Sequence, residues 1–311
     1  MTDTGPLIQA LQDNVGRAFL GKSHAVRLCL TAFFSAEHLL LEDVPGVGKT
    51  LLAKSLARSV RGTFHRLQFT PDLLPADITG SSIFDVKKQE FTFVPGPVFA
   101  NVLLADEINR TTPRTQSALL EAMSDAQVSV DGATRELPRP FFVIATQNPN
   151  EFEGTYPLPE SQMDRFQLRI SPGYPDRESA RELMERHQLG DPVDQIEPVL
   201  SMDQVAEIQR QVRQVQIDGA IREYILDLVD ATRSDPRLYL GVSVRGALAL
   251  ARAVQAWALI AGRDYVVPDD VKTLAIPTLS HRVLLRNATL RGSDGTDAVI
   301  TDLLDRIPTP T

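Results

Sequence analysis

One eleven-residue stretch, LLEDVPGVGKT from Leu40 to Thr50, constrains the fold more than any other part of the sequence. Its apolar beginning predicts a buried strand, and KTLLAKSLARSV behind it has the apolar spacing of an amphipathic helix. Between strand and helix lies a turn with two glycines, and Lys49 follows that turn directly. This order is typical of a parallel α/β sheet whose first loop cradles phosphate groups.

The glycine-rich turn has the residue types that a triphosphate requires. Gly46 and Gly48 lack a Cβ, so backbone N–H groups can approach phosphate oxygens. Lys49 can neutralise the β- and γ-phosphates, and the Thr50 hydroxyl can ligate Mg²⁺. Asp43 replaces the first glycine of the strict pattern, but the rest of the turn is retained. The residues predicted to bind the nucleotide are Val44, Pro45, Gly46, Val47, Gly48, Lys49, Thr50 and Leu51.

The first half of the chain alternates short apolar runs with helical patterns, which predicts a parallel sheet covered by helices. The strand-like runs are HLLLED, FHRLQF, NVLLAD, FFVIATQ and FQLRI. Two further segments, SSIFDVKKQEFTFV and QVSVDGATRELP, predict inserted β-hairpins. After SPGYPDRESA the long segments have helical spacing. We therefore predict an α/β nucleotide-binding domain over residues 1–174 and a smaller all-α domain over residues 175–311.

Polar groups also follow two other predicted strands. NVLLAD brings Asp106 and Glu107 to a strand end, where ligands bind in open α/β sheets. A charged loop is the simpler interpretation of this pair alone, but a phosphate-binding loop requires acidic partners. Asp106 would hold Mg²⁺, and Glu107 would orient and deprotonate the attacking water. FFVIATQNP ends near Asn148, whose amide can position that water, although a turn-forming Asn explains it as well in isolation.

Two arginines complete the candidate site. Arg165 precedes the strand-like FQLRI, and Arg245 begins a long apolar helix for which Ser243 is a candidate N-cap. A guanidinium can stabilise the charge that grows on a γ-phosphate in the transition state. Viewed alone, such an arginine is more often a salt-bridged surface residue. The predicted catalytic residues are Glu107, Asn148, Arg165 and Arg245, and the predicted metal ligands are Thr50 and Asp106.

Together these residues occur in the order found in AAA+ ATPases, and several stretches resemble the MoxR branch of that family. The stretches are EDVPGVGKT, QFTPDLLPADITG, LLADEINR, LLEAM, ATQNP and LPESQMDRF, and the resemblance covers most of residues 10–290. It implies that Gly46–Thr50 is Walker A, Asp106–Glu107 is Walker B, and Asn148 is sensor 1. It likewise implies that Arg165 is an arginine finger and Arg245 is sensor 2.

The resemblance also implies an assembly and a cellular role. It implies a ring, expected to be a hexamer, with ATP and Mg²⁺ held between subunits and Arg165 serving the neighbouring site. Whether Arg245 acts in cis or in trans stays open. The two hairpins would project towards the pore, and the all-α domain would be the lid. Chaperone-like remodelling of a client, or work with a von Willebrand factor A-type partner, is the implied function.

Composition narrows the alternatives. The formal net charge is −8, which argues mildly against a surface devoted to nucleic acid. Cys29 is the one cysteine, so no intrachain disulfide forms, and the N-terminal residues do not resemble a secretory signal. No apolar run is long enough to span a membrane. We therefore expect a cytoplasmic protein without a membrane partner.

Two other functions remain as alternatives. A DNA-acting motor of the helicase type would use basic hairpin residues to line a pore, although solvated hairpin tips are the simpler interpretation. An ATP-gated assembly switch would bind nucleotide with negligible turnover, but it would not need Glu107 or Arg165. Near the C-terminus, HRVLLRNATLRG predicts a solvated helix face. The basic residues concerned are Lys87, Lys88, Arg135 and Arg139 in the hairpins and Arg282, Arg286 and Arg291 in the C-terminal segment.

Overall fold

The centre of the protein is a five-stranded parallel sheet with the strand order β2-β5-β8-β1-β9. The computed structural model describes residues 4–42, 46–148, 154–188, 192–286 and 293–310. Because neighbouring strands run parallel, their carboxyl ends lie along one edge of the sheet, here called the carboxyl edge, and their starts along the opposite, amino edge. The strands are β1 (Leu39–Glu42), β2 (Phe64–Gln68), β5 (Val102–Asp106), β8 (Phe142–Gln147) and β9 (Leu168–Ile170).

Both faces of this sheet are covered, which is why its central strands are apolar without alternation. Leu39 and Leu41 belong to a buried cluster formed with helices on one face, whereas Leu40 belongs to a cluster on the other face. The N-terminal helices in the first cluster are α1 (Gly5–Ala18), α2 (Ser23–Phe34) and α3 (Lys49–Ser59). The other face is packed by α5 (Pro113–Asp125), near the short elements α4 (Pro75–Thr79), η1 (Ile108–Arg110) and α6 (Glu160–Met163).

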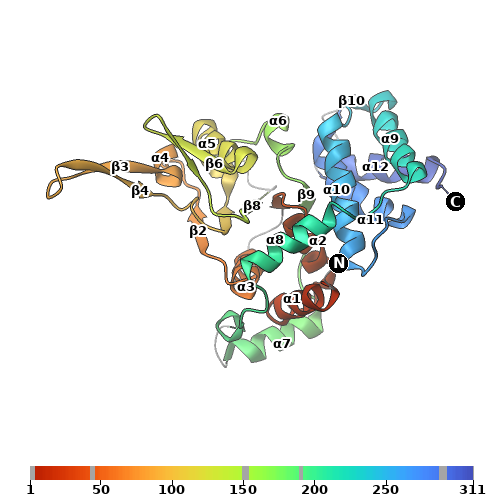
Figure 1. Ribbon diagram of the computed structural model, residues 1–311. Coiled ribbons are helices and arrows are strands. Elements are labelled where there is room, and N and C mark those ends of the chain that lie inside the picture. The colour runs from red at the N-terminus through yellow and green to blue at the C-terminus, as the bar shows by residue number, and fades with distance from the viewer. Residues whose placement is uncertain (1–3, 43–45, 149–153, 189–191, 287–292, 311) are drawn as a thin grey trace.

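The two predicted hairpins are confirmed as antiparallel pairs. They are β3 (Gly80–Asp85) with β4 (Glu90–Pro95), and β6 (Gln127–Val130) with β7 (Ala133–Glu136). Figure 1 shows the β3–β4 hairpin projecting far from the rest of the molecule. Its base is tight, because a Cβ on Gly80 would lie 2.3 Å from the Val94 carbonyl oxygen. The Arg135 guanidinium lies 3.8 Å from the Phe93 ring centroid, so this arginine packs between the hairpins instead of extending from a tip.

The C-terminal part is helical, as predicted. It contains α7 (Arg177–Gln188), η2 (Pro192–Gln195), α8 (Met202–Val212), α9 (Gly219–Ser234), α10 (Val244–Ile260), α11 (Pro268–Leu279), η3 (Ser280–Arg282) and α12 (Ser293–Arg306). The Ser243 hydroxyl accepts a hydrogen bond from the Gly246 N–H and caps α10, as its position in the sequence suggested. One short antiparallel pair, β10 (Leu238–Leu240) with β11 (Leu284–Leu285), is not visible in the helical pattern.

The segment that begins at Pro268 is where sequence and structure differ most. Its apolar spacing predicts a continuous helix to about residue 286, but α11 ends at Leu279 and a 3₁₀ turn follows. Pro277 lies inside α11 and has no N–H to donate to the Thr273 carbonyl, which weakens the helix just before its end. The prediction of a solvated face is wrong for Arg282, which is only 6% exposed.

The predicted boundary near residue 174 stays a prediction. One buried cluster contains both Leu30 of α2 and Leu250 of α10, so the sheet layer and the C-terminal helices share apolar packing. Among the described residues, no helix has the length and apolar character that crossing a bilayer would require.

Candidate functional site at the carboxyl edge

The glycine-rich turn leads from the end of β1 into α3. Gly46 and Gly48 have φ angles of +84° and +89°, which only glycine adopts readily, and Gly48 is the N-cap of α3. Gly48 is also close to Phe19, since a Cβ there would lie 3.1 Å from the Phe19 ring. The turn therefore leads into the N-terminus of a helix, the arrangement that binds phosphate. Val44 and Pro45, also predicted to bind nucleotide, lie outside the described residues.

The next four predicted nucleotide-binding residues continue this turn. Val47 is buried, and Lys49, Thr50 and Leu51 are half-buried in the first turn of α3. The Val47 carbonyl accepts a hydrogen bond from the Lys22 ammonium at 3.1 Å. Lys22 is itself buried and also donates to the Gly173 carbonyl. This buried cation therefore joins the turn to the segment after β9, a contact that the sequence did not indicate.

Asp106 and Glu107 lie at the end of β5, two strands from β1 in the sheet order. The Thr146 hydroxyl donates to Asp106 Oδ1 at 2.6 Å and accepts the Glu107 N–H at 2.9 Å. Thr146 therefore fixes both acidic residues at once. Glu107 has a φ angle of +58°, in the left-handed region that a non-glycine residue seldom occupies, and the Thr146 contact helps to hold this conformation.

Three side chains pair with these carboxylates. The Arg66 Nη2 lies 2.7 Å from Asp106 Oδ2, the Gln68 Nε2 donates to Glu107 Oε2 at 2.6 Å, and the Arg110 Nε lies 3.1 Å from that oxygen. Arg66, Gln68 and Thr146 were not among the site residues predicted from the sequence. The available signal was polar side chains inside otherwise apolar strand runs, close to the ends where the other site residues lie.

The strand order brings the candidate groups together. β8 lies between β5 and β1, so half-buried Asn148, directly after β8, follows the strand between the acidic pair and the glycine-rich turn. One hydroxyl from Thr50 and one carboxylate from Asp106 are hard oxygen donors of the kind Mg²⁺ prefers. In the described part of the chain, no group of three or more His, Cys, Asp or Glu side chains forms a metal cage. This donor set fits Mg²⁺ bound mainly through phosphate and water.

The two predicted catalytic arginines lie together, but elsewhere. Arg165 and Arg245 line a pocket of about 480 Å³ whose wall also includes Glu37, His38 and Asp164. Arg165 precedes β9, and Leu168 of β9 pairs beside Leu39, the first residue of β1. The pocket is therefore at the amino edge, and its lining includes none of the described residues of the carboxyl-edge site.

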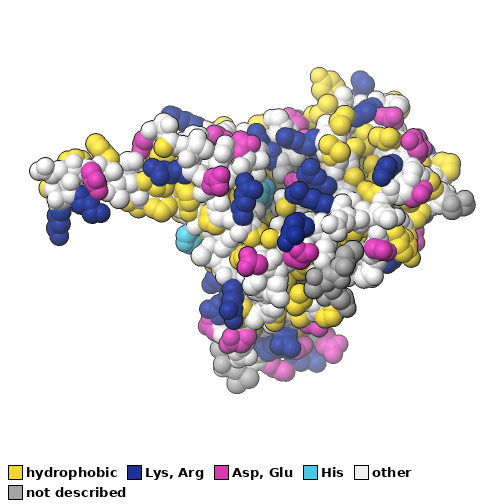
Figure 2. Space-filling view, in the orientation of Figure 1, with side chains coloured by type: hydrophobic (Ala, Val, Ile, Leu, Met, Phe, Trp, Pro, Cys, Tyr) yellow, Lys and Arg dark blue, Asp and Glu magenta, His cyan; other side chains and the backbone are white. Residues whose placement is uncertain are grey.

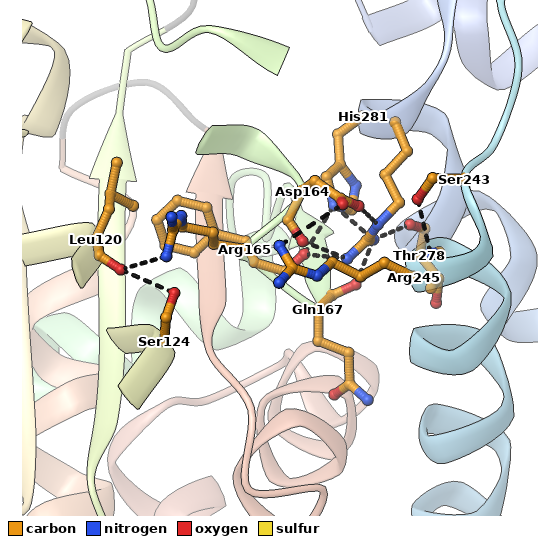
Figure 3. A network of polar contacts seen from close by, with 12 residues as sticks. Leu120, Ser124, Asp164, Arg165, Gln167, Ser243, Arg245, Thr278 and His281 are labelled. Carbon is orange, nitrogen blue, oxygen red and sulfur yellow. Dashed lines mark hydrogen bonds and ion pairs between the residues drawn. The ribbon is translucent and has the colours of Figure 1, made fainter. Parts of the chain in front are cut away.

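Within the pocket the two arginines have different contacts, as Figure 3 shows. The Arg165 Nη1 donates to the Leu120 carbonyl of α5 at 2.8 Å. Arg245 is 61% exposed, and its Nη1 lies 4.0 Å from Asp164 Oδ2. His38 is buried beside them, and burial lowers the pKa of its imidazole. Of the two, Arg245 is therefore the guanidinium more accessible to a ligand.

Comparison with known proteins agrees with this architecture. Residues 38–168 match the ATPase family associated with various cellular activities (AAA), and residues 230–303 match the AAA lid domain. The chain is 46% identical to Bacillus subtilis YeaC, covering 99% of this chain and 96% of that protein. It is 41% identical to Chaperone MoxR1 of Mycobacterium tuberculosis, covering 95% and 80% respectively.

A solved structure supports the same conclusion. A Cytophaga hutchinsonii protein assigned as an ATPase superposes with a TM-score of 0.90 at 39% identity, covering 98% of this chain and 96% of that one. With this sheet, this lid and these relatives, the chain belongs to the MoxR family of AAA+ ATPases, enzymes that bind and hydrolyse ATP.

Proposed function

We propose that this chain couples Mg²⁺-dependent ATP hydrolysis, in a ring of subunits, to remodelling or maturation of a partner protein. Lys49 and the N–H groups of Gly46–Thr50 hold the phosphates, and Thr50 and Asp106 hold Mg²⁺. When bound, Mg²⁺ neutralises charge on the β- and γ-phosphates. Glu107 orients the attacking water and accepts its proton, and Asn148 positions that water. Arg66 would have to release the Asp106 oxygen that it contacts before that oxygen could hold Mg²⁺.

One observation carries the proposal that the ring is needed for activity: the arginines and the phosphate turn lie at opposite edges of one sheet. β1 has four residues, so it alone separates the edges by roughly 13 Å. Arg165 is therefore badly placed for the nucleotide of its own chain and well placed for a neighbour's. Because Arg245 lines the same pocket, we propose that it also acts in trans. Six subunits, the number implied by the family resemblance, is the proposed ring size.

Mixing two inactive variants tests this arrangement. Arg165→Ala lacks the trans arginine but keeps its own nucleotide site, whereas Glu107→Gln keeps the arginine and loses the base. Each alone should hydrolyse ATP at least 100-fold more slowly than the natural protein. Mixed rings contain sites where an intact Glu107 meets an intact Arg165, so turnover should partly return. Absence of recovery at every ratio, although native mass spectrometry detects mixed rings, would sink the trans assignment.

The projecting hairpin supports a protein as the partner. Phe91 is 72% exposed, Val86 78% and Phe84 49%, and Figure 2 shows apolar and basic side chains along this arm. An exposed apolar surface of this kind is typical of protein contacts more than of nucleic-acid binding. The Glu107→Gln protein loaded with ATP should retain a client, and the same protein with Phe91→Ser should retain less of it. A von Willebrand factor A-type partner and a cytoplasmic location are part of this proposal.

A further inference from the structure

Arg282, in the 3₁₀ turn η3 after α11, is a buried cation whose partners lie on a distant segment. Its side chain is 2% exposed, and its Nε donates to Asp164 Oδ1 at 2.7 Å. Its Nη2 donates to the Phe166 carbonyl at 2.7 Å and to the Asp164 carbonyl at 3.2 Å. Its Nη1 donates to the Gln167 carbonyl at 3.0 Å. The planar guanidinium has fixed donor directions, so these contacts define the geometry of both segments.

The segment that Arg282 binds is the one that carries Arg165. The carbonyls on either side of Arg165, those of Asp164 and Phe166, both accept from the same guanidinium nitrogen. Figure 3 shows Arg165 extending from this network towards α5. Gln167 adds a second link to the lid, because its Nε2 donates to the Ala249 carbonyl of α10 at 3.2 Å. The backbone around Arg165 is therefore held by lid residues.

Arg282 also contacts the turn that carries Arg245. A Cβ on Gly246 would lie 3.0 Å from the Arg282 Cδ, so the side chain of Arg282 lies against the first turn of α10. The carboxylate of Asp164 lies between the two arginines, with one oxygen at Arg282 Nε and the other 4.0 Å from Arg245 Nη1. Burial lowers the pKa of Arg282 and Asp164 raises it again, so this carboxylate stabilises the buried charge.

We infer that Arg282 is a positioning residue: it fixes residues 164–167 to the lid and thereby aims Arg165 at the nucleotide of the neighbouring subunit. This inference rests on the proposed function, in which Arg165 acts in trans. It has a mechanical consequence, because η3 belongs to the lid. A shift of the lid in one subunit would displace the backbone around Arg165 and so alter hydrolysis at the next site.

Arg282→Lys is the informative substitution. A single ammonium keeps the charge beside Asp164 but cannot reach the carbonyls of Phe166 and Gln167 with the same geometry. In the assembled ring, we expect kcat for ATP to fall at least tenfold and KM to change less than twofold. KM should change less than kcat because the nucleotide site of the variant chain lies at the opposite edge of its sheet from Arg282.

Mixed rings separate a positioning role from a general loss of stability. Arg282→Lys mixed with Glu107→Gln should regain turnover, because Glu107→Gln supplies a well-placed Arg165. Arg282→Lys mixed with Arg165→Ala should not, since neither chain then offers a correctly aimed arginine. Arg165→Ala with Glu107→Gln is run in parallel. If that pair fails to recover, the trans proposal fails. If it recovers while Arg282→Lys with Glu107→Gln does not, the inference about Arg282 is wrong.

Two further variants test whether a general loss of stability or folding explains the result. Arg263→Lys disrupts a partly buried pair, since Arg263 binds both oxygens of Asp270 at 2.8 and 2.6 Å inside the lid. It leaves residues 164–167 untouched and should keep kcat within twofold of the natural protein, whereas an equal loss in both variants would overturn the inference. If Arg282→Lys does not fold, Asp164→Asn replaces it. Asp164→Asn should regain turnover when mixed with Glu107→Gln but not when mixed with Arg165→Ala. Recovery of turnover with Arg165→Ala would contradict the inference.

Discussion

The two edges of the sheet are built in different ways. At the carboxyl edge, the candidate site residues lie at or soon after strand ends, and the acidic pair is contacted from a neighbouring strand, as when Thr146 holds Asp106 and Glu107. At the amino edge, the arginine cluster joins residues separated by more than a hundred positions, with Arg282 bound to Asp164. The contacts that hold the acidic pair therefore come mainly from the sheet, whereas the arginine cluster contains contacts between the lid and the segment before β9.

The two edges also differ in how deeply their charged side chains are buried. The carboxyl edge holds half-buried carboxylates whose cationic partners, such as Arg66, are largely exposed and can move. The amino edge buries a guanidinium, and a buried ion that loses its partner is strongly destabilising. Under the proposed function, the first arrangement suits a site that exchanges a metal and a nucleotide. The second suits a site that holds Arg165 in a fixed position between turnovers.

The sharpest test of this contrast is nucleotide affinity. Lys49→Ala removes a charge-assisted phosphate contact, and the affinity for ATP should fall roughly 100-fold, since such contacts contribute about 1.5–3 kcal/mol and 1.4 kcal/mol is a factor of ten. Arg165→Ala should leave the affinity of the isolated chain within twofold. Isothermal titration with a non-hydrolysable ATP analogue, on protein diluted below ring formation, measures both. Equal losses of ATP affinity in the two variants would mean that both edges of one chain contribute to binding the same nucleotide.

The same contrast explains what could be predicted from sequence. Lys49, Asp106 and Asn148 were identifiable because a parallel sheet brings strand ends together, so local motifs were enough. The hairpins and lid helices followed from apolar periodicity. The burial of Arg282 was not predictable, because the same basic and apolar spacing describes a solvated helix until the partner segment is known. No pattern along the chain indicated that Asp164 is that partner.

A smaller effect should follow from removing the hydroxyl that supports the acidic pair. Thr146→Val keeps the shape of a 1% exposed side chain but leaves the Glu107 N–H unpaired and removes a bond to Asp106. Such a change costs about 1–3 kcal/mol. Because it also loosens Glu107, the residue proposed to orient the attacking water, we expect kcat to fall about tenfold, measured by steady-state phosphate release under saturating ATP and Mg²⁺.

The lid offers a matched control for Thr146. Thr232 is fully buried, donates to the Val229 carbonyl at 2.6 Å and accepts the Val242 N–H at 2.9 Å. Thr232→Val should therefore lose comparable stability, measured by urea unfolding, while kcat below the unfolding range stays within twofold. If both variants lose activity in proportion to stability, Thr146 has no special role at the carboxyl edge.

The smallest expected effect concerns acid sensitivity, which we assign to the amino edge. His38 is buried beside the arginine pocket; its Nδ1 accepts the Val143 N–H at 3.1 Å, so its Nε2 carries the proton that is donated to the Met123 carbonyl at 3.0 Å. Protonating Nδ1 would break the first bond. Burial lowers the pKa of His38, and burial followed by the charges of Arg282 and Arg169 lowers the pKa of His281 well below its ordinary value.

A lowered histidine pKa means that the unfolded chain binds more protons than the folded one at mildly acidic pH. The stability that the neutral imidazoles contribute is therefore fully present above the unfolded pKa of about 6.5, and it is lost as the pH falls from there towards the folded pKa. His38→Gln keeps a donor and an acceptor without titrating, so its thermal unfolding midpoint should fall less than that of the natural protein between pH 7.5 and 5.5. If the thermal unfolding midpoint of the natural protein is the same at both pH values, these buried imidazoles do not limit its stability. The cost of protonating them at the amino edge must then be offset by neighbouring contacts.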